Sequence, residues 1–459
     1  MPVSIVDQAL LERAMRHAVA YLKELPERYA GARIKRDELL AHLSRPLADR
    51  GEDPAAVIDG LAAVAPRAAM ASAGPRYFGF VIGGSLPVAL AADWMTSAWD
   101  QNAGIYVTSP LSSVIEDVTR AWLLDLLRLP AEASVGFVTG GQMAEFTCLA
   151  AARHAVLRNA GWNVEEEGLN GAPRVNIVLS AEAHITIYVA LRFLGLGTRA
   201  IHVPTDDQGR MRPDELRRVL DGLQGPTIVC AQAGNVNTGS FDPLREIAAA
   251  TRQKKAWLHI DGAFGLWAAA TGSRRSLVDG AELADSWACD AHKWLNVPYD
   301  CGVAIVRDSA AHRASMTSTA AYLEQTSGVE RDAIDWVPEF SRRARAVTVY
   351  AAIRALGRKG VEELIDGCCE HARQFADILG RDPRVKILTD VVLNQVLVRF
   401  GDSDELTRAV ITRVQQDGTC WLGGTTWQGR AAMRISVSNW ATSAEDVEKS
   451  AAAILRSIG

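Results

Sequence analysis

The chain has 459 residues, of which 48% are hydrophobic, so it can bury a large core and form more than one domain. Its net charge of -5, without a clustered basic excess, argues against a nucleic-acid partner. Seven cysteines without CxxC spacing argue for reduced thiols in the cytoplasm and against a metal site.

The first 70 residues show the periodicity of amphipathic helices with charged outer faces. This segment has little core of its own, so we expect a helical arm that packs on another domain or subunit. It lacks the features of a signal peptide, and no apolar run reaches transmembrane length, so no membrane partner is expected. Further helices, rich in tryptophan and alanine, are predicted between Tyr77 and Pro130.

The middle of the chain alternates short apolar runs with helical segments. Runs that are apolar on both faces predict a mostly parallel sheet. Ligands bind beyond the carboxyl ends of such strands. The side chains of His184, Asn235, Asp261 and Lys293 follow four of these runs and are therefore expected to meet in one crevice. The runs are "VGFVTGG", "VNIVLSAEAH", "AIHVPTD", "TIVCAQAGN", "AWLHIDGAFG", "SWACDAHK" and "CGVAIVRD".

The last part of the chain reads as a smaller α/β unit. A long helix, "RARAVTVYAAIRALG", precedes the strand signals "VVLNQVLVRF" and "AAMRISVSN", which flank a helix, and a final helix follows Thr442. The basic cluster Arg342, Arg343 and Arg345 is interpreted as a solvated helix start. The predicted organisation is an arm (1–70), a large domain (71–340) and a small domain (341–459).

The Gly140-Gly141 turn links an apolar run to a helix that starts near Gln142. A helix start offers free backbone N–H groups and a positive dipole end, which suit a phosphate. A plain strand-to-helix turn is the alternative. The motif is neither a GxGxxG fingerprint nor a Walker P-loop, which disfavours dinucleotides and nucleoside triphosphates.

Pyridoxal 5′-phosphate (PLP) requires this combination of groups: a lysine, a carboxylate for its ring nitrogen and an anion site. Asp261 ends an apolar run, where a carboxylate is costly unless paired, although it is also a possible helix cap. His184 alone is typical of a core histidine. Lys293 lies at a strand end next to His292, so burial is expected to lower the pKa of its amine.

The chain resembles the PLP-dependent group II amino-acid decarboxylases, such as the aromatic-L-amino-acid and glutamate decarboxylases. The similarity is carried by "PRYFGF", "SPLSSVIEDVTRAWLLDLLRLP", "VTGGQMAEFTCLAAAR", "SAEAHIT", "AGNVNTGSFDP", "HIDGAFG", "DAHKWLN" and "RISVSNWATSAEDV". It implies a type I (aspartate-aminotransferase-like) α/β fold, with a seven-stranded sheet. It also implies a homodimer that decarboxylates an L-amino acid to the amine and carbon dioxide, through a Schiff base and a quinonoid.

The resemblance implies roles for four residues around the cofactor ring. Lys293 matches the Schiff-base lysine, and Asp261 matches the partner of the pyridine nitrogen. His184 matches the residue that stacks on one ring face, and Ala263 packs on the other.

Around the phosphate, the resemblance implies that Gly140, Gly141 and Gln142 form the cradle. The family usually has serine or threonine at the position of Gln142, so a backbone contact is expected there. His292 matches a histidine that touches phosphate or substrate, and Asn235 lies where the family often has a threonine near the phenolic oxygen.

One departure concerns the tyrosine that protonates the substrate carbon in the family. Ala333 stands roughly where that tyrosine is expected, and Tyr322 lies well upstream. The alternatives are a shifted loop, another proton donor, oxidative deamination to an aldehyde, or another carbon–carbon lyase reaction. A catalytically silent PLP-fold protein that binds a partner is a further alternative.

The substrate is predicted from the segment that lines the pocket in the family. Phe78, Phe80 and Tyr106 favour an aromatic or bulky side chain, although aromatic residues at such spacing often belong to a core. Arg76 is a possible ligand for a second carboxylate, which keeps glutamate and aspartate open.

Overall fold

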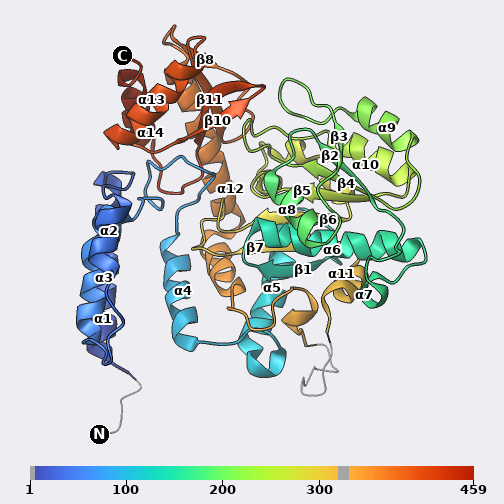
Figure 1. The fold of residues 1–459 in the computed structure, drawn as a ribbon, viewed down its shortest axis with the longest axis horizontal. Helices are drawn as coiled ribbons and strands as arrows, with labels where there is room; N and C mark the ends of the chain where they lie inside the picture. The colour runs from blue at the N-terminus through green and yellow to red at the C-terminus, as the bar shows by residue number, and fades with distance from the viewer. Residues whose placement is uncertain (1–5, 319–329) are drawn as a thin grey trace.

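The structure is a computed structural model that describes residues 6–318 and 330–459, and it is organised around two β-sheets (Figure 1). The larger sheet has the strand order β1-β7-β6-β5-β4-β2-β3, and β7 is antiparallel to both of its neighbours, whereas the other pairs are parallel. All seven predicted runs form strands of this sheet, which confirms the predicted fold class. The strands are β1 (Ser134–Val138), β2 (Asn176–Ser180), β3 (Ile201–Val203), β4 (Thr227–Gln232), β5 (Trp257–Asp261), β6 (Ser286–Asp290) and β7 (Gly302–Val306).

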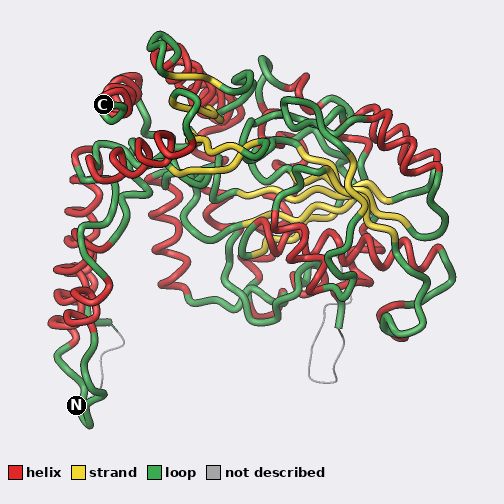
Figure 2. The backbone as a smooth tube through the Cα atoms, turned by 45° about the horizontal axis from the view of Figure 1, so that its top comes forward, coloured by secondary structure: helices red, strands yellow, loops and turns green. Residues whose placement is uncertain are grey.

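Helices lie on both sides of this strand layer (Figure 2). Along β2, Ile177 and Leu179 pack into one hydrophobic cluster and Val178 packs into the other, because successive side chains point to opposite faces. Burial on both faces explains why apolar residues occur on both faces of these runs and do not alternate with polar ones. The helices of this part are α4 (Pro87–Trp99), α5 (Pro110–Leu126), α6 (Gly141–Asn159), α7 (Val164–Glu167), α8 (Ile185–Phe193), α9 (Pro213–Asp221), α10 (Leu244–Gln253) and α11 (Ser309–Met316).

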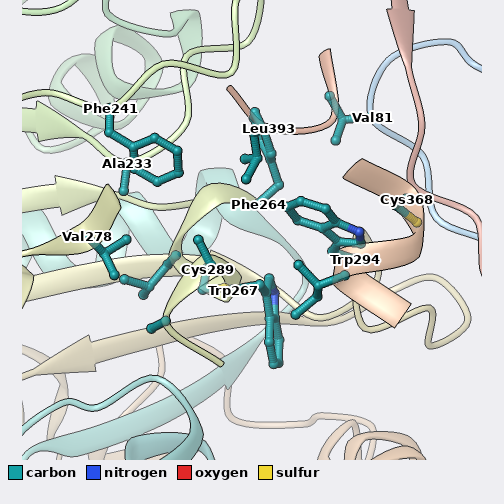
Figure 3. Packing of buried hydrophobic residues seen from close by; sticks show 14 of the residues in the cluster. Val81, Ala233, Phe241, Phe264, Trp267, Val278, Cys289, Trp294, Cys368 and Leu393 are labelled. Atoms are coloured by element: carbon teal, nitrogen blue, oxygen red, sulfur yellow. The ribbon is translucent and has the colours of Figure 1, made fainter. Parts of the chain in front are cut away.

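Large aromatic side chains support the chain where it leaves β6 (Figure 3). The indole nitrogen of Trp267 donates a hydrogen bond to the backbone oxygen of Asp290 at 3.1 Å. The rings of Phe264 and Trp294 lie 6.4 Å apart, and both are almost fully buried. These contacts anchor Asp290 and Trp294, which lie before and after Lys293 in the chain.

The C-terminal part contains a second sheet with the order β10-β11-β9-β8. Its strands are β8 (Val385–Ile387), β9 (Gln395–Phe400), β10 (Gly423–Trp427) and β11 (Arg430–Ser436). The sequence predicted β9 and β11 but not β8 and β10, which lie at the two edges of the sheet and are partly exposed. The helices are α12 (Ala346–Leu379), which is interrupted at Gly357, α13 (Asp404–Asp417) and α14 (Ala444–Arg456).

The N-terminal arm lies at one side of the molecule, away from the large sheet (Figure 1). It consists of α1 (Gln8–Glu24), α2 (Arg36–Leu43) and α3 (Pro54–Ala68), and none of their residues is fully buried. Short 3-10 helices are Leu25–Glu27, Tyr106–Thr108, Gly265–Ala270, Arg275–Val278, Ala281–Leu283 and Ala333–Asp335. Among the described residues, no helix is both long and apolar enough to cross a membrane.

A buried ion-pair cluster ties α5 to the segment that precedes α12. Glu116 accepts from Arg331 at 3.0 Å and from Arg342 at 2.5 Å, and all three side chains are nearly inaccessible. Arg342 also donates to the backbone oxygen of Phe137 in β1 at 2.6 Å. The interpretation of Arg342 as part of a solvated helix start was therefore wrong, because its charge is used inside the protein.

Replacing Glu116 with alanine is expected to lower the free energy of unfolding by about 3–5 kcal/mol, because two buried guanidinium groups lose their counter-ion. Urea denaturation followed by circular dichroism measures this change. The control is Asp125→Ala, which removes the exposed pair with Arg358 and should have almost no effect. Equal effects of the two substitutions would contradict the prediction.

Candidate active site

A cavity of about 310 Å³ lies at the carboxyl ends of β4, β5 and β6. Four of its polar side chains were named from the sequence: Asp261 is the last residue of β5, His184 caps α8, Gln142 lies in the first turn of α6, and Lys293 follows β6. The expectation that polar side chains at the carboxyl ends of the strands meet in one crevice, here called the strand-end rule, therefore holds for these groups. The lining residues that were named from the sequence are Phe80, Gly141, Gln142, His184, Asp261, Ala263, His292 and Lys293.

The start of α6 forms a cradle in which side chains are excluded. A Cβ atom at Gly141 would lie 2.7 Å from Oδ2 of Asp290, and one at Gly140 would lie 3.0 Å from Cε1 of His292. The first turn of α6 thus presents its backbone N–H groups to the cavity at close range. This arrangement fits a phosphate at the positive end of the helix dipole.

Lys293 forms an ion pair with Asp290, and its Nζ lies 2.9 Å from Oδ2 of the carboxylate. Burial lowers the pKa of the amine, but the charge and hydrogen bond of Asp290, together with the charge of Asp261, outweigh burial and raise it. The expectation of a lowered pKa was therefore wrong. The amine is held as an ammonium ion, and Asp290 is positioned to take its proton before it acts as a nucleophile.

Asp261 and His184 are both oriented by hydrogen bonds. Oδ1 of Asp261 accepts the backbone N–H of Ala263 at 3.1 Å, which favours the charged carboxylate. Nδ1 of His184 lies 2.8 Å from the hydroxyl of Thr186. Burial lowers the pKa of His184, so its ring is neutral and suited to flat packing against an aromatic ring.

Four residues named from the sequence do not line the cavity, and one of them, Gly140, directly precedes α6. Asn235 is fully buried, and its Oδ1 accepts the backbone N–H groups of Asn237 and Thr238 in its own turn. Phe78 packs edge-on against Phe375 in the core, with ring centroids 4.9 Å apart. Tyr106 lies in a 3-10 helix whose first N–H donates to Asp332, so it belongs to a different part of the surface.

Sequence reasoning missed two buried carboxyl groups that line the cavity, Asp290 and Glu145. Asp290 opens the "DAHKW" motif at the end of β6, so the strand-end rule applied to the other residues would have found it. Its Oδ1 has no hydrogen-bond partner among the described residues, and Nε2 of His292 lies 3.5 Å away. Glu145 gave a weaker signal, a single acidic residue in an otherwise apolar helix turn.

The donor set of the cavity fits PLP. Lys293 and Asp261 line the cavity, Asp261 forms no ion pair within the described part of the chain, and a glycine-lined helix start provides an anion cradle. The fold and these groups define a PLP-dependent enzyme of type I fold.

The pyridoxal-dependent decarboxylase conserved domain matches residues 41–400 of the chain. The chain belongs to this family, and PLP is its cofactor. It is an amino-acid decarboxylase, a carboxy-lyase, as the sequence predicted. The alternative reactions and the silent binding protein are not favoured by this membership.

Several relatives cover most of the chain. It is 26% identical to the aromatic-L-amino-acid decarboxylase of Bacillus atrophaeus, over 94% of this chain and 90% of that protein. It is 30% identical to the L-2,4-diaminobutyrate decarboxylase of Rhizobium meliloti (strain 1021), over 76% of this chain and 71% of that protein. The fold is similar to that of Oryza sativa TDC solved with PLP and tryptamine, with a TM-score of 0.92 and 23% identity, over 100% of this chain and 99% of that chain.

Proposed function

We propose that this decarboxylase acts on L-amino acids with an aromatic or bulky apolar side chain. The observation that supports this proposal is the apolar part of the cavity wall, formed by Phe80, Val81, Val236 and Phe264. Phe80 is 62% exposed although its ring stacks on Trp421 at 5.5 Å. An aromatic face is thus available in the cavity that holds Lys293, and aromatic rings favour aromatic partners.

Arg76 also favours an aromatic or bulky apolar substrate, because it is not free to bind the side-chain carboxylate of an acidic substrate. It is 8% exposed, donates to Oδ1 of Asp446 at 3.1 Å and donates to the backbone oxygen of Thr419 at 2.8 Å. A guanidinium that is already paired and buried does not offer a bidentate site to a substrate carboxylate. Relatives carry names for aromatic, diaminobutyrate and acidic amino acids, so family membership alone does not select the substrate.

The proposed roles follow the positions of the groups. PLP supplies an electron sink for the pair of electrons left when the bond between the α-carbon and the carboxylate breaks. Lys293 would hold the cofactor covalently, and Asp261 would favour the protonated ring nitrogen. His184 and Ala263 would contact the cofactor ring.

The phosphate end of the site has its own set of groups. Gly141 and Gln142 offer backbone N–H groups to the phosphate, and Gly140 allows the chain to approach closely. His292 lies between Asp290 and Tyr299, whose ring centroid is 4.4 Å from that of His292. Asn235 donates to Oε1 of Gln232 at 3.3 Å and directly precedes Val236, so it supports two residues of the cavity wall.

Turnover measured over a panel of amino acids is the test of this proposal. With PLP-loaded protein, tryptophan, tyrosine or phenylalanine is expected to give kcat/KM at least about tenfold above glutamate, since burial of an aromatic ring contributes more than 1.4 kcal/mol. Carbon dioxide and hydrogen peroxide are measured together. Carbon dioxide without peroxide supports simple decarboxylation, and faster turnover of glutamate or diaminobutyrate would overturn the proposed substrate class.

The position expected for the family tyrosine carries no hydroxyl in this chain. Ala333 is 4% exposed and lies in the 3-10 helix Ala333–Asp335, and Tyr322 lies outside the described residues. The phenol of Tyr299 is the described hydroxyl that interacts electrostatically with Lys293, at the His292 side of the cavity. We therefore include Tyr299 in the proposal as the proton donor. A solvent isotope effect on kcat that Tyr299→Phe leaves unchanged would exclude that role.

We also propose a homodimer in which residues 1–70 form the dimerisation arm, beside a cofactor-binding domain (71–340) and a small domain (341–459). The arm supports this proposal because Leu11 is 64% and Leu61 is 57% exposed, and apolar side chains of this size favour burial. Sedimentation at micromolar concentration is expected to give twice the mass of one chain. A PLP-saturated monomer would contradict the proposal.

A cytoplasmic location is proposed from the cysteines. All seven are free and buried, as expected for a protein that folds in a reducing compartment. No nucleic-acid or membrane partner is proposed. Cell fractionation of the tagged chain tests the location, and recovery from an oxidising compartment would contradict it.

A further inference from the structure

Glu145 is a third carboxyl group in the cofactor cavity, and its partner is a histidine of the sheet. It lies one turn inside α6, is 1% exposed and lines the same cavity as Asp261 and Asp290. Its Oε2 lies 2.5 Å from Nε2 of His259, which is completely buried. The roles assigned above use neither residue.

The contact continues into the sheet as a chain of hydrogen bonds. Nδ1 of His259 lies 2.8 Å from Oγ of Ser286 on the neighbouring strand, and that oxygen accepts the indole N–H of Trp257 at 2.9 Å. His259 and Asp261 are two residues apart on β5, so their side chains lie on the same face of the sheet. The chain of hydrogen bonds therefore begins next to the carboxylate that faces the cofactor ring.

The cavity holds more acidic groups than cations. Of the described residues that line it, Lys293 is the one lysine or arginine, and it is paired with Asp290 at 2.9 Å. His184 and His292 are neutral because burial lowers the pKa of each ring. Arg434 acts on His184 but does not line the cavity. Within residues 6–318 and 330–459, Glu145 and Asp261 thus have no permanently charged counter-ion in the cavity, and two neighbouring buried carboxyl groups favour a state in which one keeps its proton.

The hydrogen bonds decide which carboxyl keeps the proton. Asp261 accepts a backbone N–H, which stabilises a carboxylate, whereas Glu145 meets a ring nitrogen that accepts a proton when the imidazole is neutral. Burial raises the pKa of Glu145 well above its usual range and lowers that of His259 to about 4. The imidazole then carries its own proton on Nδ1 and donates a hydrogen bond to Oγ of Ser286. This oxygen has two lone pairs, one for His259 and one for the indole N–H of Trp257.

We propose that Glu145 is a neutral carboxylic acid that keeps its proton and donates a hydrogen bond to Nε2 of His259. This pair is a positioning device which leaves Asp261 as the ionised carboxyl at the cofactor ring. The inference deepens the proposed function, because it rests on the role given to Asp261. Glu145 acts through Asp261 and takes no part in the bond changes itself.

Infrared difference spectroscopy of the full chain tests the protonation state directly. The spectrum of the wild type minus that of Glu145→Gln, at pH 7, is expected to contain the carbonyl stretching band of a protonated carboxylic acid. The band should be present in both cofactor-free and PLP-loaded protein. The control is Glu363→Gln, an exposed glutamate that should change only the carboxylate bands. A carboxylate band at Glu145 in place of the acid band would overturn the inference.

A pH titration of the visible absorbance of the loaded protein gives a second readout. Glu145→Gln keeps a neutral donor to His259, so its midpoint should stay within about 0.3 pH units of wild type, whereas loss of a buried charge would move it by about one unit or more. Glu145→Ala removes the donor and should shift the midpoint, and recovery in the glutamine variant separates positioning from a general structural role. An equal shift in both variants would overturn the inference.

The two proposals fail separately in these experiments. The infrared band does not depend on turnover, so an acid band in a protein that favours glutamate would refute the proposed substrate class and leave the inference standing. Aromatic turnover together with a carboxylate band at Glu145 would refute the inference alone.

Discussion

Lys293→Ala is expected to abolish turnover together with the visible absorbance of the covalently linked cofactor. Lys293 is the amine in the cavity that can form a covalent link to the PLP aldehyde, and it is held 2.9 Å from the carboxylate that can take its proton. Loss of a covalent catalytic group lowers kcat by about 10⁴- to 10⁶-fold in enzymes where it has been removed. The absorbance spectrum and the release of carbon dioxide from the same sample measure both effects.

The phosphate cradle provides the internal control for this variant. Gly141 and Gln142 lie at the start of α6 and do not depend on the lysine, so PLP should still bind without a covalent link and be removed by dialysis. Lys359→Ala, at a side chain that is 87% exposed, should leave absorbance and turnover unchanged. Turnover near that of the wild type in Lys293→Ala would show that "DAHKW" is not the cofactor site.

The second large effect is expected from Asp261→Ala, which should keep part of the visible absorbance while kcat falls by about 10²- to 10³-fold. The covalent link needs the lysine and not the aspartate, whereas the electron sink needs a charge that stabilises the protonated ring nitrogen. Asp261→Asn preserves the size of the side chain and removes its charge. It should therefore reproduce the kinetic loss, and full activity of the asparagine variant would contradict the proposed electrostatic role.

The large sheet was predictable from the sequence because six of its strands are buried on both faces, and the edge strand β3 is the exception. Runs such as "TIVCAQ", which became β4, leave no alternative to an interior strand. The edge strands β8 and β10 of the small sheet were not predictable, because exposed edge positions tolerate polar residues and glycine. The buried charge of Arg342 was missed for a related reason, since its partner Glu116 is more than 200 residues away in the chain.

The candidate site was predictable where chemistry follows strand ends, and not where it depends on distances between side chains. His184, Asp261 and Lys293 follow three strands of one sheet and line one cavity. The sequence contained no information on the ion pair between Lys293 and Asp290, whose charged atoms lie 2.9 Å apart. This ion pair raises the pKa of Lys293, opposite to the expected direction. Asn235 follows a strand as well, but its side chain is used by the turn that it begins.

The buried thiols are protected from alkylation in the folded chain, so the rates at which they react can report on local unfolding. Each cysteine side chain is at most 2% exposed, and burial raises the pKa of Cys301 to about 12, so neither access nor thiolate is available in the native state. The cysteines lie in β4, β6, α6 and α12 and near β7 and β10, so they sample both sheets. Alkylation of any one of them therefore requires its neighbourhood to open. The order in which the seven react with a small electrophile maps which parts of the molecule open first and which open only with the whole.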